Sequence, residues 1–265
     1  MVSTMARIKI GLSLKSLGVP FRRALLEAQK LGVSGVELDA AGDFAPKTLS
    51  QTGRRELGHL LRSHNLELAA LGCLLRRGLD VAENQQQRID HIREVLSLSY
   101  DLGPRLVVVH AGKIPEKEDD ARAPFMKEGL TALGQHGDRV GALLALETGL
   151  ESGAVLKQYL DRFDCGSLGA SFNPGNLLIN GHNPMESARA LGTRLVYAHA
   201  TDARQASAGK SLVPLGRGDI DWLEMLATLE EIGYHGWLIV DREAGLYALP
   251  EAAAGVKFLR RLIGA

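Results

Sequence analysis

Eight short apolar runs recur along the chain, and this repeat limits the fold more than any other feature. The starts of successive runs lie about 26 to 41 residues apart. Each run is almost wholly apolar instead of alternating with polar residues, which is typical of strands buried on both faces of a parallel sheet. The runs occupy residues 8–14, 35–39, 66–72, 105–111, 142–148, 168–173, 195–201 and 236–243.

The segments between the runs have the spacing of helices. In FRRALLEAQKLG and DWLEMLATLEEIG, apolar residues recur at intervals of three and four. Several segments end in a glycine, which accepts the left-handed backbone conformation that satisfies the last helix carbonyls. These glycines are Gly32, Gly103, Gly137, Gly192 and Gly233.

A strand and the helix that follows it form one βα unit of about 30 residues, and the chain divides into eight such units without a remainder. The pattern predicts an α/β fold, a single (β/α)8 TIM barrel domain over residues 1–265. A doubly wound open sheet is the alternative. It is disfavoured because the segment GLSLKSLG, at the first run, lacks the glycine spacing of a phosphate-binding turn.

Charge and cysteine content exclude several classes of protein. Lys and Arg together number 31, as do Asp and Glu, so no overall charge favours nucleic acid or an anionic membrane. Cys73 and Cys165 form neither a metal-type pair nor a disulfide framework, which fits a reducing cytoplasm. No apolar run approaches the ~18 residues of a membrane span, and MVSTMARIKIGLSL has no signal-peptide pattern. We therefore expect a cytoplasmic protein that binds neither nucleic acid nor membrane.

Polar residues follow six of the eight predicted strands. In a barrel of this kind the loops after the strands build the active site. Side chains from strands five, seven and eight would converge there as the mixed oxygen and nitrogen ligands that suit divalent cations, and burying such charges without a cation is costly. Taken singly, each residue can also be explained by a structural role, as one member of an ion pair or as a histidine in the core. The candidates are Glu37, Asp39, His110, Glu147, Asn173, His199, Asp202, Asp241 and Glu243.

A resemblance to a known family rests on seven stretches that occur in the same order over nearly the whole chain. They are GVEL, LVVVHAG, LALETG, FNPGNLLINGHNP, YAHATDA, PLGRGDIDW and EIGYHGWLIVDRE. The sequence resembles the xylose isomerase-like TIM barrel superfamily, in particular its sugar phosphate isomerase/epimerase branch. In that family a glutamate, an aspartate, a histidine and a glutamate, after strands five to eight, hold one divalent metal ion. The resemblance places this site on Glu147, Asn173, His199 and Asp241, for Mn²⁺, Mg²⁺, Co²⁺ or Zn²⁺.

Two of these four positions depart from the family pattern. Asn173 has an amide in place of a carboxylate, and Asp241 is one methylene shorter than a glutamate. An amide oxygen can still coordinate a hard cation, but the four ligands would carry two negative charges instead of three. Glu243 lies two residues after Asp241, and a bulge in the strand could bring it to the site.

The resemblance also implies a reaction and the residues that carry it. The reaction is metal-assisted proton transfer next to the carbonyl of a sugar or sugar phosphate, through an enediolate, with Glu147 and Asp241 as catalytic carboxylates. His110 could bond a substrate hydroxyl, and Glu37 could orient His110 or the substrate. A homodimer is expected because relatives often form one. The expected substrate-binding residues are Glu37, His110, Asn176, Asp202, Arg217 and Glu243.

Two other functions stay open. The first is a sugar-binding barrel without catalysis, because the replacements at Asn173 and Asp241 weaken the metal site. The second is a DNA-repair enzyme of the endonuclease IV type, which shares the barrel but needs three zinc ions and more histidines. Strand three supplies no histidine, Asn176 replaces another, and the Asp-x-His after strand seven is missing.

Overall fold

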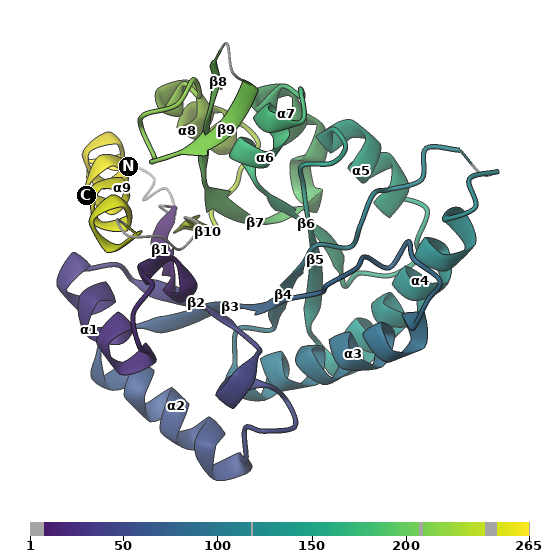
Figure 1. The fold of residues 1–265 in the computed structure, drawn as a ribbon, viewed down its shortest axis with the longest axis horizontal. Coiled ribbons are helices and arrows are strands. Elements are labelled where there is room, and N and C mark those ends of the chain that lie inside the picture. The colour runs from purple at the N-terminus through teal and green to yellow at the C-terminus, as the bar shows by residue number, and fades with distance from the viewer. Residues whose placement is uncertain (1–7, 118, 207–208, 242–247, 265) are drawn as a thin grey trace, which may run out of the picture.

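The strands of the chain close into a parallel barrel surrounded by helices (Figure 1). This computed structural model describes residues 8–117, 119–206, 209–241 and 248–264. The strand order is β1-β10-β7-β6-β5-β4-β3-β2, and β2 pairs with β1 to complete the circle. The barrel strands are β1 Lys9–Ser13, β2 Gly35–Asp39, β3 Glu67–Cys73, β4 Leu106–Val109, β5 Leu143–Glu147, β6 Leu168–Phe172, β7 Leu195–Ala200 and β10 Trp237–Val240.

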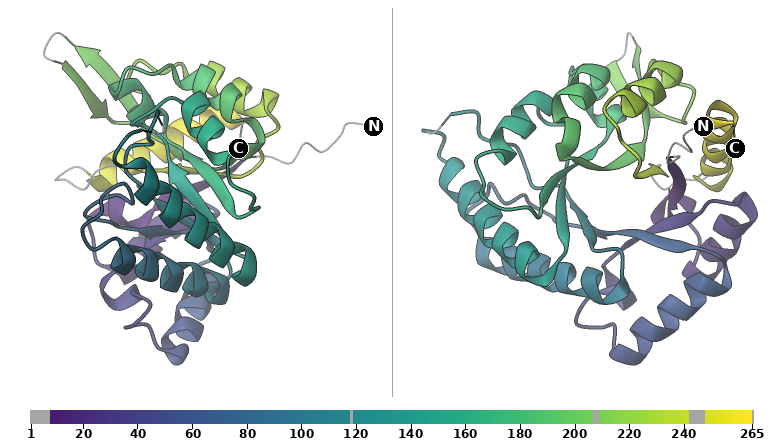
Figure 2. Two further views of the ribbon diagram at one scale, coloured as in Figure 1. Left: turned by 90° about the vertical axis from the view of Figure 1, so that its right-hand side faces the viewer. Right: turned by 180° about the vertical axis from the view of Figure 1, so that it is seen from behind.

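All eight predicted strands are confirmed, each within the apolar run that predicted it or within one residue of its end. The predicted (β/α)8 barrel is therefore correct. The helices cover the outside of the barrel, as the view from behind also shows (Figure 2). The α-helices are α1 Phe21–Leu31, α2 Gln51–Ser63, α3 Gln85–Leu102, α4 Ala123–Val140, α5 Gly153–Leu160, α6 Pro174–Ile179, α7 Pro184–Leu191, α8 Trp222–Glu231 and α9 Ala248–Ile263, and the 3-10 turns are η1 Leu14–Leu17, η2 Gly42–Phe44 and η3 Gly192–Arg194.

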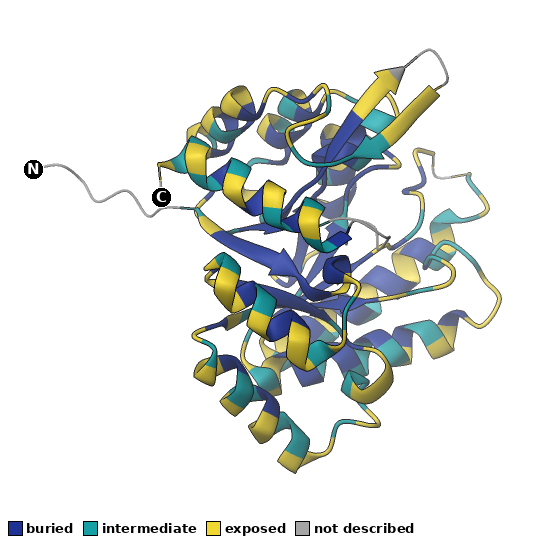
Figure 3. Cartoon of the chain, turned by 60° about the vertical axis from the view of Figure 1, so that its left-hand side comes forward, coloured by how far each residue is buried: buried dark blue, intermediate teal, exposed yellow. Residues whose placement is uncertain are grey.

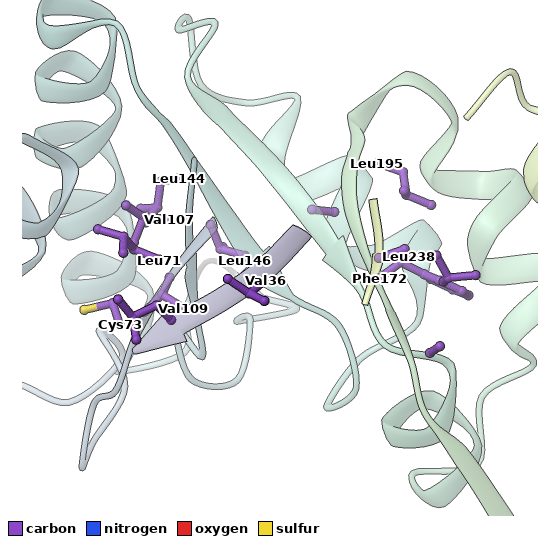
Figure 4. Packing of buried hydrophobic residues seen from close by; sticks show 14 of the residues in the cluster. Val36, Leu71, Cys73, Val107, Val109, Leu144, Leu146, Phe172, Leu195 and Leu238 are labelled. Atoms are coloured by element: carbon purple, nitrogen blue, oxygen red, sulfur yellow. The ribbon is translucent and has the colours of Figure 1, made fainter. Parts of the chain in front are cut away.

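Apolar side chains fill both sides of the barrel wall. Outside it, Leu71, Val107 and Leu144 of three neighbouring strands pack side by side under the helices (Figure 4). Inside it, a smaller cluster includes Tyr197 and Ile239. This arrangement explains why the runs are apolar throughout, since both faces of each strand are buried.

The predicted glycine at the end of the fourth helix is wrong. Gly137 lies inside α4, which continues to Val140, and Gly141 follows it with φ 76°. A Cβ atom at position 137 would lie 2.6 Å from Oγ of Ser167. Gly137 is therefore small because a neighbouring segment packs against it, and not because the helix ends there.

A hairpin that the sequence pattern did not predict follows β7. It consists of β8 (Asp202–Ala206) and β9 (Gly209–Val213), which pair antiparallel. The hairpin projects away from the barrel (Figures 2 and 3), and β9 begins with three exposed residues. It leaves the barrel at the end of a strand, where the chemistry of such folds is located.

Candidate functional site

A cavity of about 330 Å³ opens at the carboxyl ends of the strands. Pockets for small molecules have volumes of this order. Six of the residues that the sequence suggested lie in its lining, whereas Glu37 and His199 are buried and are not among the lining residues. The lining consists of Lys15, His110, Glu147, Asn173, Asn176, Thr201, Asp202, Leu212, Val213 and Asp241.

Glu147, the last residue of β5, has three polar partners at this cavity. Its Oε1 accepts hydrogen bonds from Nδ2 of Asn173 at 2.6 Å and from Nδ2 of Asn176 at 3.1 Å. Its Oε2 lies 3.0 Å from Nε2 of His110, whose side chain is 63% exposed. The two amides fix one oxygen of Glu147, and the other oxygen faces an accessible imidazole.

Asn173 ends β6 and caps the helix that follows. Asparagine is favoured at an N-cap and proline at the first helical position, so the Asn-Pro sequence starts α6 here. Its Oδ1 accepts from the backbone N–H of Asn176 at 3.0 Å and from the hydroxyl of Thr201. Because a backbone N–H can only donate, these bonds determine which end of the amide is oxygen. The NH₂ group therefore points at Glu147.

His199 and Glu37 form a buried ion pair inside the barrel. Nε2 of His199 lies 2.9 Å from Oε2 of Glu37, and both side chains are 2% exposed. Burial alone would raise the pKa of Glu37, but the charge and hydrogen bond of His199 outweigh it and lower this pKa to about 2. Burial would lower the pKa of His199, but Glu37 raises it to about 9. The sequence suggested that Glu37 could orient His110, and the structure pairs it with His199 instead.

Asp241 is held by the turn after β1. Oγ of Ser16 donates to its Oδ1 at 2.6 Å, and Nζ of Lys15 lies 3.8 Å from its Oδ2. Burial acts to lower the pKa of Lys15, but the neighbouring carboxylates, with Asp241 first, raise it above its usual value. Lys15 was not among the residues predicted from the sequence. Its signal was its position, two residues past the end of β1, at the edge where the active-site loops gather.

Asp202 supports the hairpin in addition to lining the cavity. Its Oδ2 accepts from the backbone N–H groups of Gly216 and Gly218 and from Nε1 of Trp222, and its Oδ1 accepts from its neighbour Ala203. Burial raises the pKa of this carboxyl group, and the four donors oppose that change. Asp202 therefore joins the hairpin, the loop after it and α8.

The remaining expected residues are Arg217 and Glu243. Arg217 is exposed in the loop between β9 and α8 and is not in the cavity lining. Glu243 lies outside the described residues. The hairpin, in contrast, brings two unexpected apolar residues to the cavity, Leu212 and Val213.

Two of the four expected metal ligands, Asn173 and Asp241, do not fit a divalent cation in this arrangement. The single oxygen of Asn173 accepts two hydrogen bonds, and the carboxylate of Asp241 is held by Ser16 and Lys15. The contact between Nε2 of His199 and Glu37 leaves Nδ1 of the same ring and does not exclude a metal ion. Within the described ranges, no three His, Cys, Asp or Glu residues are placed to hold a metal ion. The side chains satisfy one another in the positions where the family pattern places a cation.

Comparison with known proteins finds relatives whose names refer to sugars or inososes. An inosose dehydratase of Lacticaseibacillus casei is 24% identical over 258 residues, which cover 85% of this chain and 83% of the relative. The crystal structure of a xylose isomerase domain protein from Planctomyces limnophilus has a TM-score of 0.86 and 24% identity, and the match covers 97% of each chain.

Two further solved structures have the same fold and were determined with ligands. D-allulose 3-epimerase from Methylomonas sp., in complex with D-allulose, has a TM-score of 0.76 and 16% identity over 97% of each chain. A xylose isomerase-like TIM barrel protein from Mycobacterium smegmatis, in complex with magnesium, has a TM-score of 0.77 and 16% identity over 97% of this chain and 96% of that one.

No helix in the described part of the chain is both long and apolar enough to span a bilayer. The family model for the xylose isomerase-like TIM barrel matches residues 25–262, from within α1 to within α9. The chain therefore belongs to the xylose isomerase-like TIM barrel family.

Proposed function

We propose that this protein is a sugar isomerase or epimerase that moves a proton on the carbon next to a carbonyl group. One observation carries the proposal: Glu147 and Asp241, from the ends of β5 and β10, line one cavity with room for a small molecule. The names of the relatives point to the same kind of carbon. A 3-epimerase acts on carbon 3 of a ketose, which lies beside the carbonyl, and dehydration of an inosose begins with loss of a proton from the carbon beside its carbonyl.

Glu147 is the base in this proposal. Oε2 of Glu147 takes the proton from carbon, while Oε1 stays bound to Asn173 and Asn176. The electron pair of the broken C–H bond forms the carbon–carbon double bond of an enediolate, and the carbonyl oxygen takes up the negative charge. His110, 3.0 Å from Oε2, can bond a substrate hydroxyl or hold the basic oxygen in place.

Asp241 passes a proton from solvent to the enediolate, and the proton on Glu147 is released to solvent. Return to the same carbon on the other face gives an epimer, and return to the neighbouring carbon gives an isomer. Ser16 and Lys15 hold its carboxylate beside the cavity.

Proton exchange in heavy water tests the proposal directly. Purified protein is incubated with ketoses, ketose phosphates and inososes in D₂O, and deuterium at each carbon is followed by NMR, with and without EDTA. We expect exchange at a carbon next to the carbonyl of at least one sugar, together with a second sugar as product. If no carbon of any sugar exchanges, the proposed reaction is wrong.

A sugar-binding barrel without catalysis is the second candidate. Two contacts favour it, because they engage the carboxylates that would otherwise react. Asn173 donates to Glu147, and Lys15 lies beside Asp241. Saturable binding of a sugar in calorimetry, together with no deuterium exchange, would support this function and exclude the first.

A further inference from the structure

We infer that this cavity functions without a divalent cation, and that the Lys15 ammonium group supplies the positive charge that faces the substrate oxygens. The inference deepens the proposed function and rests on it for the kind of substrate. It assigns to Lys15 a direct contact with the sugar. Among the described residues that line the cavity, Lys15 is the one lysine or arginine.

Position 173 offers one side-chain oxygen where the family pattern has two. An aspartate has two oxygens, so one can cap α6 while the other coordinates a metal ion. Asn173 has one oxygen, and the N–H of Asn176 and the hydroxyl of Thr201 both donate to it. To present that oxygen to a cation, the amide would have to turn over, which would place its NH₂ against the N–H of Asn176 and lose the cap.

One oxygen of Glu147 already has two hydrogen-bond donors. In the present arrangement the amide of Asn173 lies 2.6 Å from Oε1, and the amide of Asn176 lies 3.1 Å from the same atom. These donors satisfy Oε1, so a cation at Oε1 would have to displace both amides and would meet N–H groups instead of lone pairs. The other oxygen, Oε2, lies 3.0 Å from Nε2 of His110.

Lys15 reaches the cavity from the turn after β1. The other three residues of η1, Leu14, Ser16 and Leu17, are buried, and Lys15 alone extends from this turn to the cavity. Its Nζ is 3.8 Å from Asp241, longer than a normal hydrogen bond. The ammonium group is thus near its counter-ion and still has donors for a substrate oxygen. A fixed positive charge there stabilises the negative oxygen of an enediolate.

A manganese titration tests the inference without any assay of activity. Protein freed of metal by EDTA and dialysis is titrated with Mn²⁺ by calorimetry, and free Mn²⁺ is counted by electron paramagnetic resonance. We expect wild type to show no stoichiometric binding below about 1 mM. Stoichiometric binding of Mn²⁺ by wild type at micromolar concentration would overturn the inference.

A double variant tests the stated cause. Asn173→Asp combined with Lys15→Met restores a second oxygen and removes the positive charge, so we expect it to bind Mn²⁺ at least about tenfold more tightly than wild type. The matched control is Asn183→Asp with Lys30→Met, because Asn183 caps α7 and bonds Glu186, and Lys30 pairs with Glu27, all away from the cavity lining. Equal Mn²⁺ binding by the double variant and its control would contradict the roles of Asn173 and Lys15.

Lys15→Met alone tests the contact with substrate, on whichever sugar undergoes exchange in D₂O. We expect exchange by wild type to be unaffected by EDTA, a rate at least about 100-fold lower in Lys15→Met, and partial recovery in Lys15→Arg. An unchanged rate in Lys15→Met would overturn the role of Lys15. If no sugar exchanges at all, the proposed function fails, and the Mn²⁺ titrations of wild type and the double variant still decide whether the cavity takes a cation.

Discussion

Asn173 donates its side-chain amide to Glu147 across 2.6 Å while its side-chain oxygen caps α6. One side chain therefore links the end of β6 to the end of β5 and starts the next helix. This relationship gives Asn173 a structural role that can be measured separately from any role in chemistry, because the capping bond and the bond to Glu147 both contribute to stability.

Asn173→Ala should lower the free energy of unfolding by about 2 to 4 kcal/mol. Loss of the cap accounts for about 1 kcal/mol, and unsatisfied partners at Glu147 and Thr201 add about 1 to 3 kcal/mol, since Asn173 is only 3% exposed. Urea unfolding measures the change. Asn183→Ala, which removes an exposed cap from α7, should cost about 1 kcal/mol. Equal losses in the two variants would show that the bond to Glu147 adds nothing.

Glu147→Gln should reduce proton exchange by a factor of about 10² to 10⁴, because a carboxamide cannot accept the proton. The fold should persist, since the side chain keeps its shape and an oxygen for the amide of Asn173. Deuterium incorporation into the exchanging sugar, followed by NMR, measures the effect. Glu186→Gln is the matched control, because Glu186 also accepts from an asparagine amide but lies away from the cavity lining. Similar exchange rates in the two variants would contradict the role of Glu147 as base.

The strands of the barrel could be predicted because a strand buried on both faces must be apolar along its length. The β8–β9 hairpin could not, because exposed residues such as Arg204 and Lys210 carry no apolar period. The pairing of Glu37 with His199 could not be predicted from the sequence either. It joins β2 to β7, which are separated in the barrel by β1 and β10, so it depends on the closed geometry and not on sequence spacing.

Asp202→Asn should lower the free energy of unfolding by about 2 to 4 kcal/mol and loosen the hairpin. Its two oxygens accept four donors in a site that is 1% exposed. An asparagine has one side-chain oxygen, so at least one buried donor loses its acceptor at a cost of about 1 to 3 kcal/mol, and loss of the charge weakens the remaining bonds by about 1 kcal/mol. Thermal unfolding and amide hydrogen exchange over residues 202–222 measure the two effects. Asp219→Asn is the control, because Asp219 accepts one backbone bond, from Gln205, and is exposed. A loss no greater than that of the control would contradict the prediction.

Glu151 should make the stability of the protein depend on pH. The residue is 5% exposed in the loop after β5, and burial raises its pKa to about 7, against the opposing hydrogen bond from the N–H of Ile114. In the unfolded chain this group has its ordinary pKa, 4.5. Between these two values the folded protein keeps a proton that the unfolded chain has released, so the stabilisation from Glu151 is complete below pH 4.5 and is lost as the pH rises to 7.

The Glu151→Gln variant separates this effect from all other titrating groups. The difference in free energy of unfolding between wild type and variant should shift by about 3 kcal/mol between pH 4 and pH 8, with wild type losing stability relative to the variant at the higher pH. Urea unfolding at half-unit steps of pH measures it. Glu231→Gln, at an exposed ion pair with Arg189, should show almost no such shift. A difference that stays constant from pH 4 to pH 8 would mean that Glu151 is as acidic in the folded protein as in the unfolded chain.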